Sequence, residues 1–310
     1  MRITQQAFTG SGKLLKGALH CHTTRSDGEG DPADVIRLHA KNGYDFMALT
    51  DHRRYNYENF APETNMTIIP GMEMDAGITT GDALCFHTVV LGPAKADGNP
   101  FEQDQRFESG RVRNQFEYQA TLDWLHESNQ LTTMCHPEWS CTPVRMYEHL
   151  HGNFALELWN TGCAWGDHLD RDNQQQWDDL LVNGMKIYGI AVDDGHGAMY
   201  HCQGWVMVNA ENNVDAILEA LKNGAFYAST GPEIFDFWID DENVAHVKCS
   251  ACSFVRFHSA ASITRKLYGE KGSPIMEASM PVRACDTYLR VEVTDLAGRV
   301  AWSNPIFLGK

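Results

Sequence analysis

The residues best suited to chemistry begin with two histidines near the start of the chain. His20 and His22 stand two positions apart in a segment with the pattern of a β-strand, and Asp27 follows five residues later. Alternate residues of a strand point to the same face, so the two imidazoles would lie together. Imidazole and carboxylate groups are typical ligands of Zn²⁺, Mn²⁺ and Fe²⁺. The spacing therefore predicts part of a metal site.

Further histidines and carboxylates follow later apolar runs that read as strands. Any one of these histidines alone is better explained as a hydrogen-bonded structural residue than as a ligand, but so many at or just beyond strand ends indicate a common site. The candidate ligands are His20, His22, Asp27, His52, Glu73, His87, His136, Asp194 and His196. Nine ligands exceed the needs of one ion and suffice for two or three divalent ions, with a carboxylate between them.

Alternating strands and helices must position these residues. Asp31 as N-cap and Pro32 at the first helical position predict a helix that ends near Gly43. The pattern also predicts a long helix over residues 105–129 and further helices near 174–183 and 213–223. Such alternation favours parallel strands with crossover connections, and in a barrel of such strands the carboxyl ends meet at one mouth. A doubly wound open sheet is the competing architecture.

The pattern changes after residue 232. Short segments of alternating polarity, such as FDFWI and TYLRVEVTD, replace the helical periodicity. This predicts two domains, a barrel over residues 1–232 and a small antiparallel, β-sandwich-like appendage over residues 233–310. The second domain contains no recognisable ligand or acid–base constellation, so we expect it to be structural or to shape the substrate site.

Composition limits the function classes. The 310 residues include 41 acidic and 25 basic side chains, for a formal net charge of −16. Such a charge disfavours nucleic acid beyond short nucleotides as a partner. No apolar run is long enough to span a bilayer, and no signal peptide is evident. We therefore expect a cytoplasmic protein, with its nine cysteines reduced and the Cys249–Cys252 pair without a metal or redox role.

The motifs together resemble those of the polymerase and histidinol phosphatase (PHP) family of metal-dependent phosphoesterases. The resemblance rests on LHCHTTRSDG from Leu19, on Thr50-Asp51-His52, and on later segments. These later segments are GMEM around Glu73, the run at His87, Cys135-His136-Pro137 and Asp193-Asp194-Gly195-His196. It covers about residues 18–230 and implies a distorted (β/α)7 TIM-like barrel with a trinuclear metal centre.

By the family pattern, Glu73 would bridge two ions. The first ion would take His20, His22, Glu73 and Asp194; the second Glu73, His87 and His136; the third Asp27, His52 and His196. Asp27 stands where some members place histidine, and Asp193 is off-pattern for a ligand and is expected to act behind one. The cofactors implied are two or three divalent ions of zinc, manganese or iron.

The reaction that such a centre suggests is hydrolysis of a phosphate ester by attack of a metal-bridging hydroxide on phosphorus. The expected substrate is a small phosphorylated metabolite or a short nucleotide. Asp27, Asp51 and His196 are the candidates for protonating the leaving group. The residues expected to bind substrate are Arg25, Arg53 and Glu157, with Trp139, Asn160 and Trp165 as further pocket residues; solvated loop arginines are the alternative for Arg25 and Arg53.

Two other functions compete with this prediction. An amidohydrolase-like enzyme would use the same metals on a C–N bond, but its usual carboxylated lysine has no counterpart at a strand end here. A non-catalytic, metal-loaded binding module is the other, and it has little need for nine ligands. The sequence therefore predicts a hydrolase acting on phosphoric ester bonds.

Overall fold

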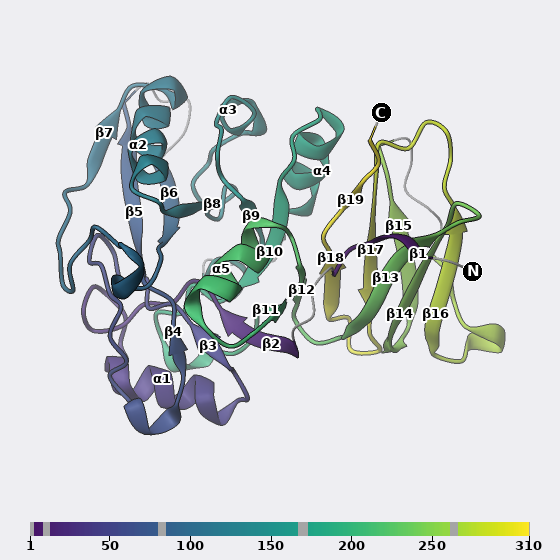
Figure 1. The fold of residues 1–310 in the computed structure, drawn as a ribbon, viewed down its shortest axis with the longest axis horizontal. Helices are drawn as coiled ribbons and strands as arrows, with labels where there is room; N and C mark the ends of the chain where they lie inside the picture. Colours follow the sequence, from purple (N-terminus) through teal and green to yellow (C-terminus); the bar gives the residue numbers. More distant parts are fainter. Residues whose placement is uncertain (1–2, 9–12, 80–84, 167–172, 261–265, 310) are drawn as a thin grey trace.

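The computed structural model describes residues 3–8, 13–79, 85–166, 173–260 and 266–309 (Figure 1). The α-helices lie in the first, mixed α/β part of the chain, whereas the carboxyl-terminal part consists mainly of strands. The α-helices are α1 (Pro32–Lys41), α2 (Gln115–Glu127), α3 (Val144–Tyr147), α4 (Gln174–Val182) and α5 (Val214–Lys222). None of the described helices is long and apolar enough to cross a bilayer.

Local sequence signals account for the helix ends. Asp31 caps α1 by accepting a hydrogen bond from the Ala33 amide, and Pro32 occupies the first turn, as predicted. The helix predicted over residues 105–129 is shorter, because Asn114 accepts hydrogen bonds from the amides of Phe116 and Glu117 and starts α2 there. Part of the preceding segment forms strand β7 (Gly110–Val112) instead.

One sheet of six strands positions five of the nine candidate ligands, two of them on its strands and three just after them. Its order is β10-β9-β8-β6-β5-β7. The strands not yet bounded are β5 (Gly71–Ile78), β6 (Cys85–Leu91), β8 (Leu131–Met134), β9 (Ala155–Asn160) and β10 (Tyr188–Val192). Parallel pairs join β8 to β9 and β9 to β10, whereas β6 runs antiparallel to both β5 and β8.

A second sheet runs from the α/β part into the carboxyl-terminal part. Its order is β15-β17-β18-β12-β11-β2-β3-β4, with β19 (Ile306–Phe307) paired to β17. The strands are β2 (Lys13–Ala18), β3 (Phe46–Met47), β4 (Thr67–Ile68), β11 (Trp205–Ala210), β12 (Phe226–Ser229), β15 (Phe254–His258), β17 (Tyr288–Thr294) and β18 (Val300–Ser303).

Of the expected distorted (β/α)7 TIM-like barrel, the structure shows the mixed α/β fold with several sheets, in which the described strands do not all run parallel. Six residues separate Ile78 from Cys85. That is too few for a parallel crossover, which needs a dozen or more residues, so β5 and β6 pair antiparallel. Two isolated parallel bridges, Cys21 to Gly195 and His52 to Glu73, bring the edges of the two sheets together.

The carboxyl-terminal strands form an antiparallel unit, as predicted for that stretch. A four-stranded sheet in the order β1-β13-β14-β16 contains β1 (Ile3–Gln6), β13 (Ile234–Asp240), β14 (Val244–Cys252) and β16 (Ile275–Pro281). Strand β1 therefore lies to the right of β2 in Figure 1, among strands of the carboxyl-terminal unit. The domain boundary after residue 232 stays a prediction, and β12 pairs with β18 across it.

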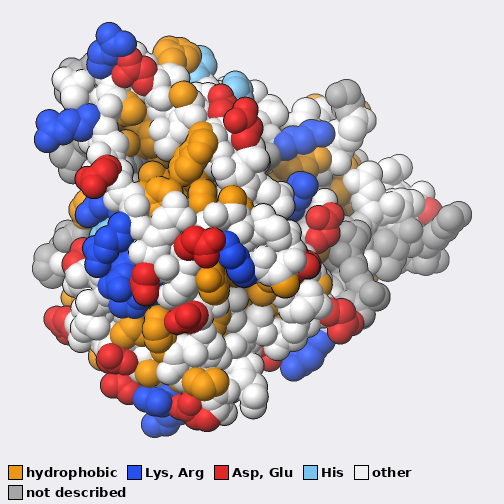
Figure 2. Space-filling model, turned by 60° about the vertical axis from the view of Figure 1, so that its left-hand side comes forward, with side chains coloured by type: hydrophobic (Ala, Val, Ile, Leu, Met, Phe, Trp, Pro, Cys, Tyr) orange, Lys and Arg blue, Asp and Glu red, His pale blue; other side chains and the backbone are white. Residues whose placement is uncertain are grey.

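Charges of both signs are spread over the face of the molecule that Figure 2 shows. On the face drawn in Figure 2, acidic and basic side chains are interspersed among white and orange areas. Charge of mixed sign on the surface is consistent with an ordinary solubilising role for much of the net −16.

Candidate metal centre

Four buried side chains converge at the meeting edge of the two sheets. His20 Nε2 and His22 Nε2 lie 3.1 Å apart, and each lies 3.0–3.3 Å from Glu73 Oε2 and Asp194 Oδ1. Four ligands about 2.0–2.1 Å from one tetrahedral ion would be about 3.3 Å from one another. The central tetrad, as we call these four residues, thus has the dimensions of a metal site.

One strand and the loops that follow two others deliver the tetrad. His20 and His22 follow β2, Glu73 lies on β5, and Asp194 comes two residues after the end of β10. Asp194 has a φ of 48° and His136 a φ of 23°, in the left-handed region that non-glycine residues seldom adopt. Strained backbone of this kind clusters at functional sites, where the surrounding structure holds it in place.

A second group surrounds the other oxygen of Glu73. His87 Nδ1 lies 2.7 Å and His136 Nε2 lies 3.4 Å from Glu73 Oε1. Trp139 packs edge-on against both imidazoles. Glu73 thereby faces histidines with each of its two oxygens, which is the arrangement expected of a carboxylate between two cations.

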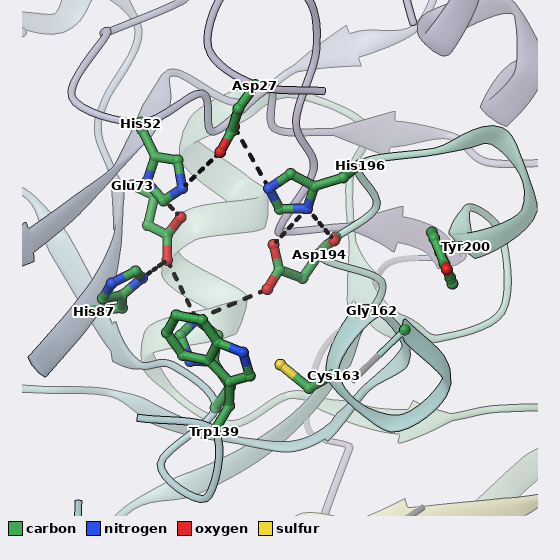
Figure 3. Close-up of a pocket in the computed structure, with 12 residues that line it drawn as sticks. Asp27, His52, Glu73, His87, Trp139, Gly162, Cys163, Asp194, His196 and Tyr200 are labelled. Carbon is green, nitrogen blue, oxygen red and sulfur yellow. Dashed lines mark hydrogen bonds and ion pairs between the residues drawn. The ribbon is translucent and has the colours of Figure 1, made fainter. Parts of the chain in front are cut away.

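A third group lies at the open side of the tetrad (Figure 3). Asp27 places its carboxylate oxygens 3.5 Å from His52 Nε2 and 3.5 Å from His196 Nε2. His22 Nδ1 is 3.6 Å from Asp27 Oδ1, so the His22 ring lies between this group and the tetrad. The structure therefore brings all nine candidate ligands together in three contiguous groups.

Three buried polar atoms of the ligand groups have no hydrogen-bond partner. These atoms are His52 Nδ1, Glu73 Oε2 and Asp194 Oδ1. Leaving a buried polar atom unpaired costs about 1–3 kcal/mol, more for a charged group. All three atoms belong to the groups described above, so a divalent cation that accepts their lone pairs fits the residues present.

Several imidazoles are oriented for ligation through the nitrogen that faces the centre. His20 Nδ1 donates to Glu157 Oε1 (2.7 Å), and His196 Nδ1 donates to the Asp194 carbonyl (2.9 Å). His136 Nδ1 bonds Ser140 Oγ (3.1 Å). A hydrogen bond at one ring nitrogen fixes the tautomer and leaves the lone pair of the other for a metal.

Electrostatics favour positive charge in the centre. Burial alone would raise the pKa of Glu73, but His20, His87 and His52 together outweigh it and hold that pKa well below its usual range. Conversely, burial lowers the pKa of His22, but Asp194 and Glu73 raise it to about 9. The carboxylates are thus ionised and attract cations, and a metal ion that displaces protons from the histidines would release them to solvent.

Glu157 was predicted to bind substrate, and the structure corrects this. Its side chain is fully buried behind His20 and is bonded on both oxygens, because Oε2 also accepts from the His136 amide (2.9 Å) and from Asn160 Nδ2 (3.0 Å). Asn160 in turn donates to Asp194 Oδ2 at 3.1 Å. Glu157 and Asn160 therefore contact ligand residues, and neither is among the residues that line the cavity described below.

Glu157→Gln is expected to lower metal affinity and any metal-dependent turnover by about 10–100-fold, the range found for residues that orient metal ligands. The change keeps the volume of the side chain and weakens the acceptor of His20 Nδ1–H. Metal titration by calorimetry would measure it, with Glu127→Gln on the exposed end of α2 as the matched control. Unchanged affinity in Glu157→Gln would contradict the orienting role.

Asp51 was predicted as a possible catalytic acid, and its surroundings argue against that role. The carboxylate is fully buried and accepts hydrogen bonds from the amides of Thr23 and Ser26 (2.9 and 3.1 Å) and from both hydroxyl groups. It does not line the cavity described below. Asp51 shapes the loop between His22 and Asp27 because it satisfies that loop's backbone donors.

The two arginines predicted to bind substrate are paired within the protein. Arg25 donates to Asn56 Oδ1 (2.7 Å) and pairs with Asp104, with only 8% of its side chain exposed. Arg53 pairs with Asp75. Neither lines the cavity, because acidic partners from other segments, which sequence spacing does not reveal, hold both guanidinium groups.

An open cavity of about 460 Å³ lies over the three groups. Ligand residues form its floor, as Figure 3 shows, and Trp139, Cys163 and Tyr200 contribute side chains around them. The residues that line it are Asp27, His52, Glu73, His87, His136, Trp139, Gly162, Cys163, Gly166, Asp194, His196 and Tyr200. Trp139 had been expected there, whereas Trp165 is not among the lining residues, and no motif pointed to Cys163 or Tyr200.

Comparison with known proteins identifies the fold. No family model matches the sequence, and no curated protein matches it. Among solved structures, a two-domain protein from Bacteroides vulgatus containing a predicted PHP-like metal-dependent phosphoesterase is similar over 100% of this chain and 91% of its own, with a TM-score of 0.50 and 16% identity. The predicted resemblance to PHP-like proteins is thus confirmed as a likeness of fold.

Two further solved structures match less well. An amidohydrolase from Chromobacterium violaceum with bound sulfate and no metal is 15% identical, with a TM-score of 0.41 over 59% of this chain and 88% of its own. A protein from Bifidobacterium adolescentis assigned as a metal-dependent phosphoesterase is 14% identical, with a TM-score of 0.40 over 67% of this chain and 96% of its own.

Proposed function

We propose that this protein is a metal-dependent phosphoesterase that hydrolyses a small phosphorylated metabolite or a short nucleotide. The observation that carries the proposal is the central tetrad, whose ligand atoms lie 3.0–3.3 Å apart with two of its carboxylate oxygens left without hydrogen bonds. Two or three divalent ions of zinc, manganese or iron fit the nitrogen and oxygen donors present.

When bound, such ions supply an acidified water and the positive charge that phosphoester hydrolysis requires. The chain's own residues would hold these ions and orient the substrate. The tetrad holds the deepest position, Glu73 connects it with His87 and His136, and Asp27, His52 and His196 close the outer side. Asp27 and His196 line the cavity, so they remain the candidates for proton transfer to the leaving group.

The cavity favours a substrate with a single phosphoryl group. Its volume of about 460 Å³ suits a small ligand, and Trp139 and Tyr200 offer aromatic surface to the leaving group. Among the described residues that line the cavity there is no lysine or arginine to bind a second phosphate. We therefore place monoesters ahead of longer nucleotides.

The proposal predicts phosphate release that depends on the bound metal. Protein purified with Mn²⁺, Zn²⁺ or Fe²⁺ would be assayed against a panel of phosphomonoesters and short nucleotides, before and after EDTA treatment. We expect release with at least one metal, its loss in EDTA, and its return on adding the metal back, because a bound metal supplies the acidified water and the positive charge that the reaction needs.

Metal content measured on the same samples makes the assay decisive. Absence of phosphate release from protein shown to hold two or three ions would contradict the proposal. Hydrolysis of amide or amidine substrates by such a sample would favour the C–N hydrolase, and binding without turnover would favour the binding module.

A further inference from the structure

A second cluster of metal-binding side chains lies behind the strand end that carries His20 and His22. Cys21 stands between these histidines, and its side chain points to the opposite face of the strand, where it is fully buried. There it packs with Val35 and Ile36 of α1. The sulfur of Cys21 and one nitrogen each of His39 and His201 all lie within 4.8 Å of one another.

His39 presents an unsatisfied nitrogen in this cluster. It lies on α1, is fully buried, and donates from Nδ1 to the Val35 carbonyl at 2.8 Å. Its Nε2 is buried and has no hydrogen-bond partner. A backbone carbonyl bonded at Nδ1 fixes the tautomer whose Nε2 lone pair can bind a metal.

His201 faces Cys21 from the loop that follows Asp194 and His196. Its Nδ1 lies 3.8 Å from Cys21 Sγ, and its side chain is nearly buried. The Gly195 backbone packs against its ring so closely that a Cβ on Gly195 would lie 2.3 Å from Nδ1. Sulfur and nitrogen ligands of a tetrahedral zinc ion are about 3.5 Å apart. The ring is therefore held near ligand distance.

Burial favours the neutral form of both imidazoles, which is the form that binds a metal. Burial lowers the pKa of His39 to about 4, and burial followed by the neighbouring His39 lowers the pKa of His201 to about 3. His201 also lines an open cavity of about 260 Å³ beside α1, so its ring lies between the buried cluster and that cavity.

We propose that Cys21, His39 and His201 bind a zinc ion at a site separate from the candidate phosphoesterase centre. A donor set of one thiolate and two imidazoles is suited to Zn²⁺. The ion joins α1 to the strand end that carries His20 and His22 and to the loop beyond Asp194 and His196. Its role is structural, because it fixes the two segments that deliver four ligands of the other centre.

The test uses the full chain reconstituted with Co²⁺, which gives a near-ultraviolet sulfur-to-cobalt charge-transfer band only where a thiolate is a ligand. We expect this band in the wild-type protein and its loss in Cys21→Ser and in His39→Gln. It should persist in Cys163→Ser, which removes the thiol lining the other cavity, and in Asp194→Asn, which disables the other centre.

Metal content of the zinc-loaded protein provides the second measurement. His39→Gln is expected to hold one zinc ion per chain fewer than wild type, whereas His126→Gln on α2, whose Nε2 bonds Thr132, should hold the same number. Circular dichroism reports whether each variant is folded. If Cys21→Ser is not folded, the zinc content and the cobalt band of His39→Gln test whether this cluster binds metal.

Absence of the band from wild-type protein would overturn the proposal whatever the variants do. A band that survives both Cys21→Ser and His39→Gln, or that disappears in Cys163→Ser, would also overturn it. The cluster would then be a dry contact between a thiol and two imidazoles. Because Asp194→Asn removes phosphoesterase activity and not this band, failure of one proposal is distinguishable from failure of the other.

Discussion

Replacing Asp194 with asparagine is expected to deplete metal from the centre and to lower phosphate release by roughly three orders of magnitude. Charge stabilisation by a metal contributes several kcal/mol, and about 1.36 kcal/mol corresponds to tenfold in rate. Asp194 lies 3.0–3.3 Å from both tetrad histidines and is held ionised, since His20 and His22 outweigh the effect of burial on its pKa. Metal content and kcat with the best substrate of the panel would measure the effect.

The substitution keeps the size of the side chain, so a loss of activity with an unchanged circular dichroism spectrum would belong to the site. Asp123→Asn, which changes an exposed carboxylate on α2, is the matched control and should leave both quantities unchanged. His22→Ala should reproduce the loss, because it removes a ligand of the same tetrad. A folded Asp194→Asn protein with wild-type kcat and metal content would refute the assignment of Asp194 as a ligand.

The candidate ligands could be predicted because their signals are local. Each belongs to a short motif on a strand or in the loop that follows one, and neighbouring strands of a sheet bring such motifs together. Helix α1 was predictable for the same reason, since its cap and its first-turn proline adjoin each other in sequence. Both predictions needed no knowledge of contacts between distant segments.

The roles of residues around the ligands were not predictable, because their partners lie far away in sequence. Glu157 reaches His20 across 137 positions, and Arg25 reaches Asp104 across 79. A carboxylate near a strand end can bind substrate in the pocket, or it can hydrogen-bond a metal ligand and orient it. Which role it has depends on its hydrogen-bond partner, and sequence spacing alone does not identify that partner.

The pairing of strands and its direction could not be predicted from the sequence either. Alternation of strands and helices predicted parallel strands, but a connection of six residues makes β5 and β6 antiparallel. Strand β1 pairs with β13, more than 200 residues later. The pattern of a short strand indicates neither its partner nor the sheet that it joins, so the sequence did not reveal these antiparallel pairs.

A buried ion pair that joins α4 to β17 gives the largest expected effect on stability. Arg290 has a fully buried side chain, donates to Asp178 Oδ1 from Nε (3.0 Å) and from Nη2 (2.5 Å), and lies over the ring of Trp177. Removing one partner of a buried pair costs about 3–5 kcal/mol, because the other charge stays buried without compensation. Asp178→Ala should lower the free energy of unfolding by about 3 kcal/mol, near the lower end of this range. The Asp178 side chain is 19% exposed, and Arg290 keeps its hydrogen bond to Gln174.

Urea unfolding followed by circular dichroism would measure this loss as a lower midpoint. Asp179→Ala, at the next position of α4, removes a carboxylate that bonds Gln175 on the exposed side and should change the free energy of unfolding by less than about 0.5 kcal/mol. Adding Arg290→Met to Asp178→Ala should restore part of the loss, because the double variant no longer buries an unpaired charge. If the double variant were less stable than Asp178→Ala, packing of the Arg290 side chain, and not its pairing, would account for the effect.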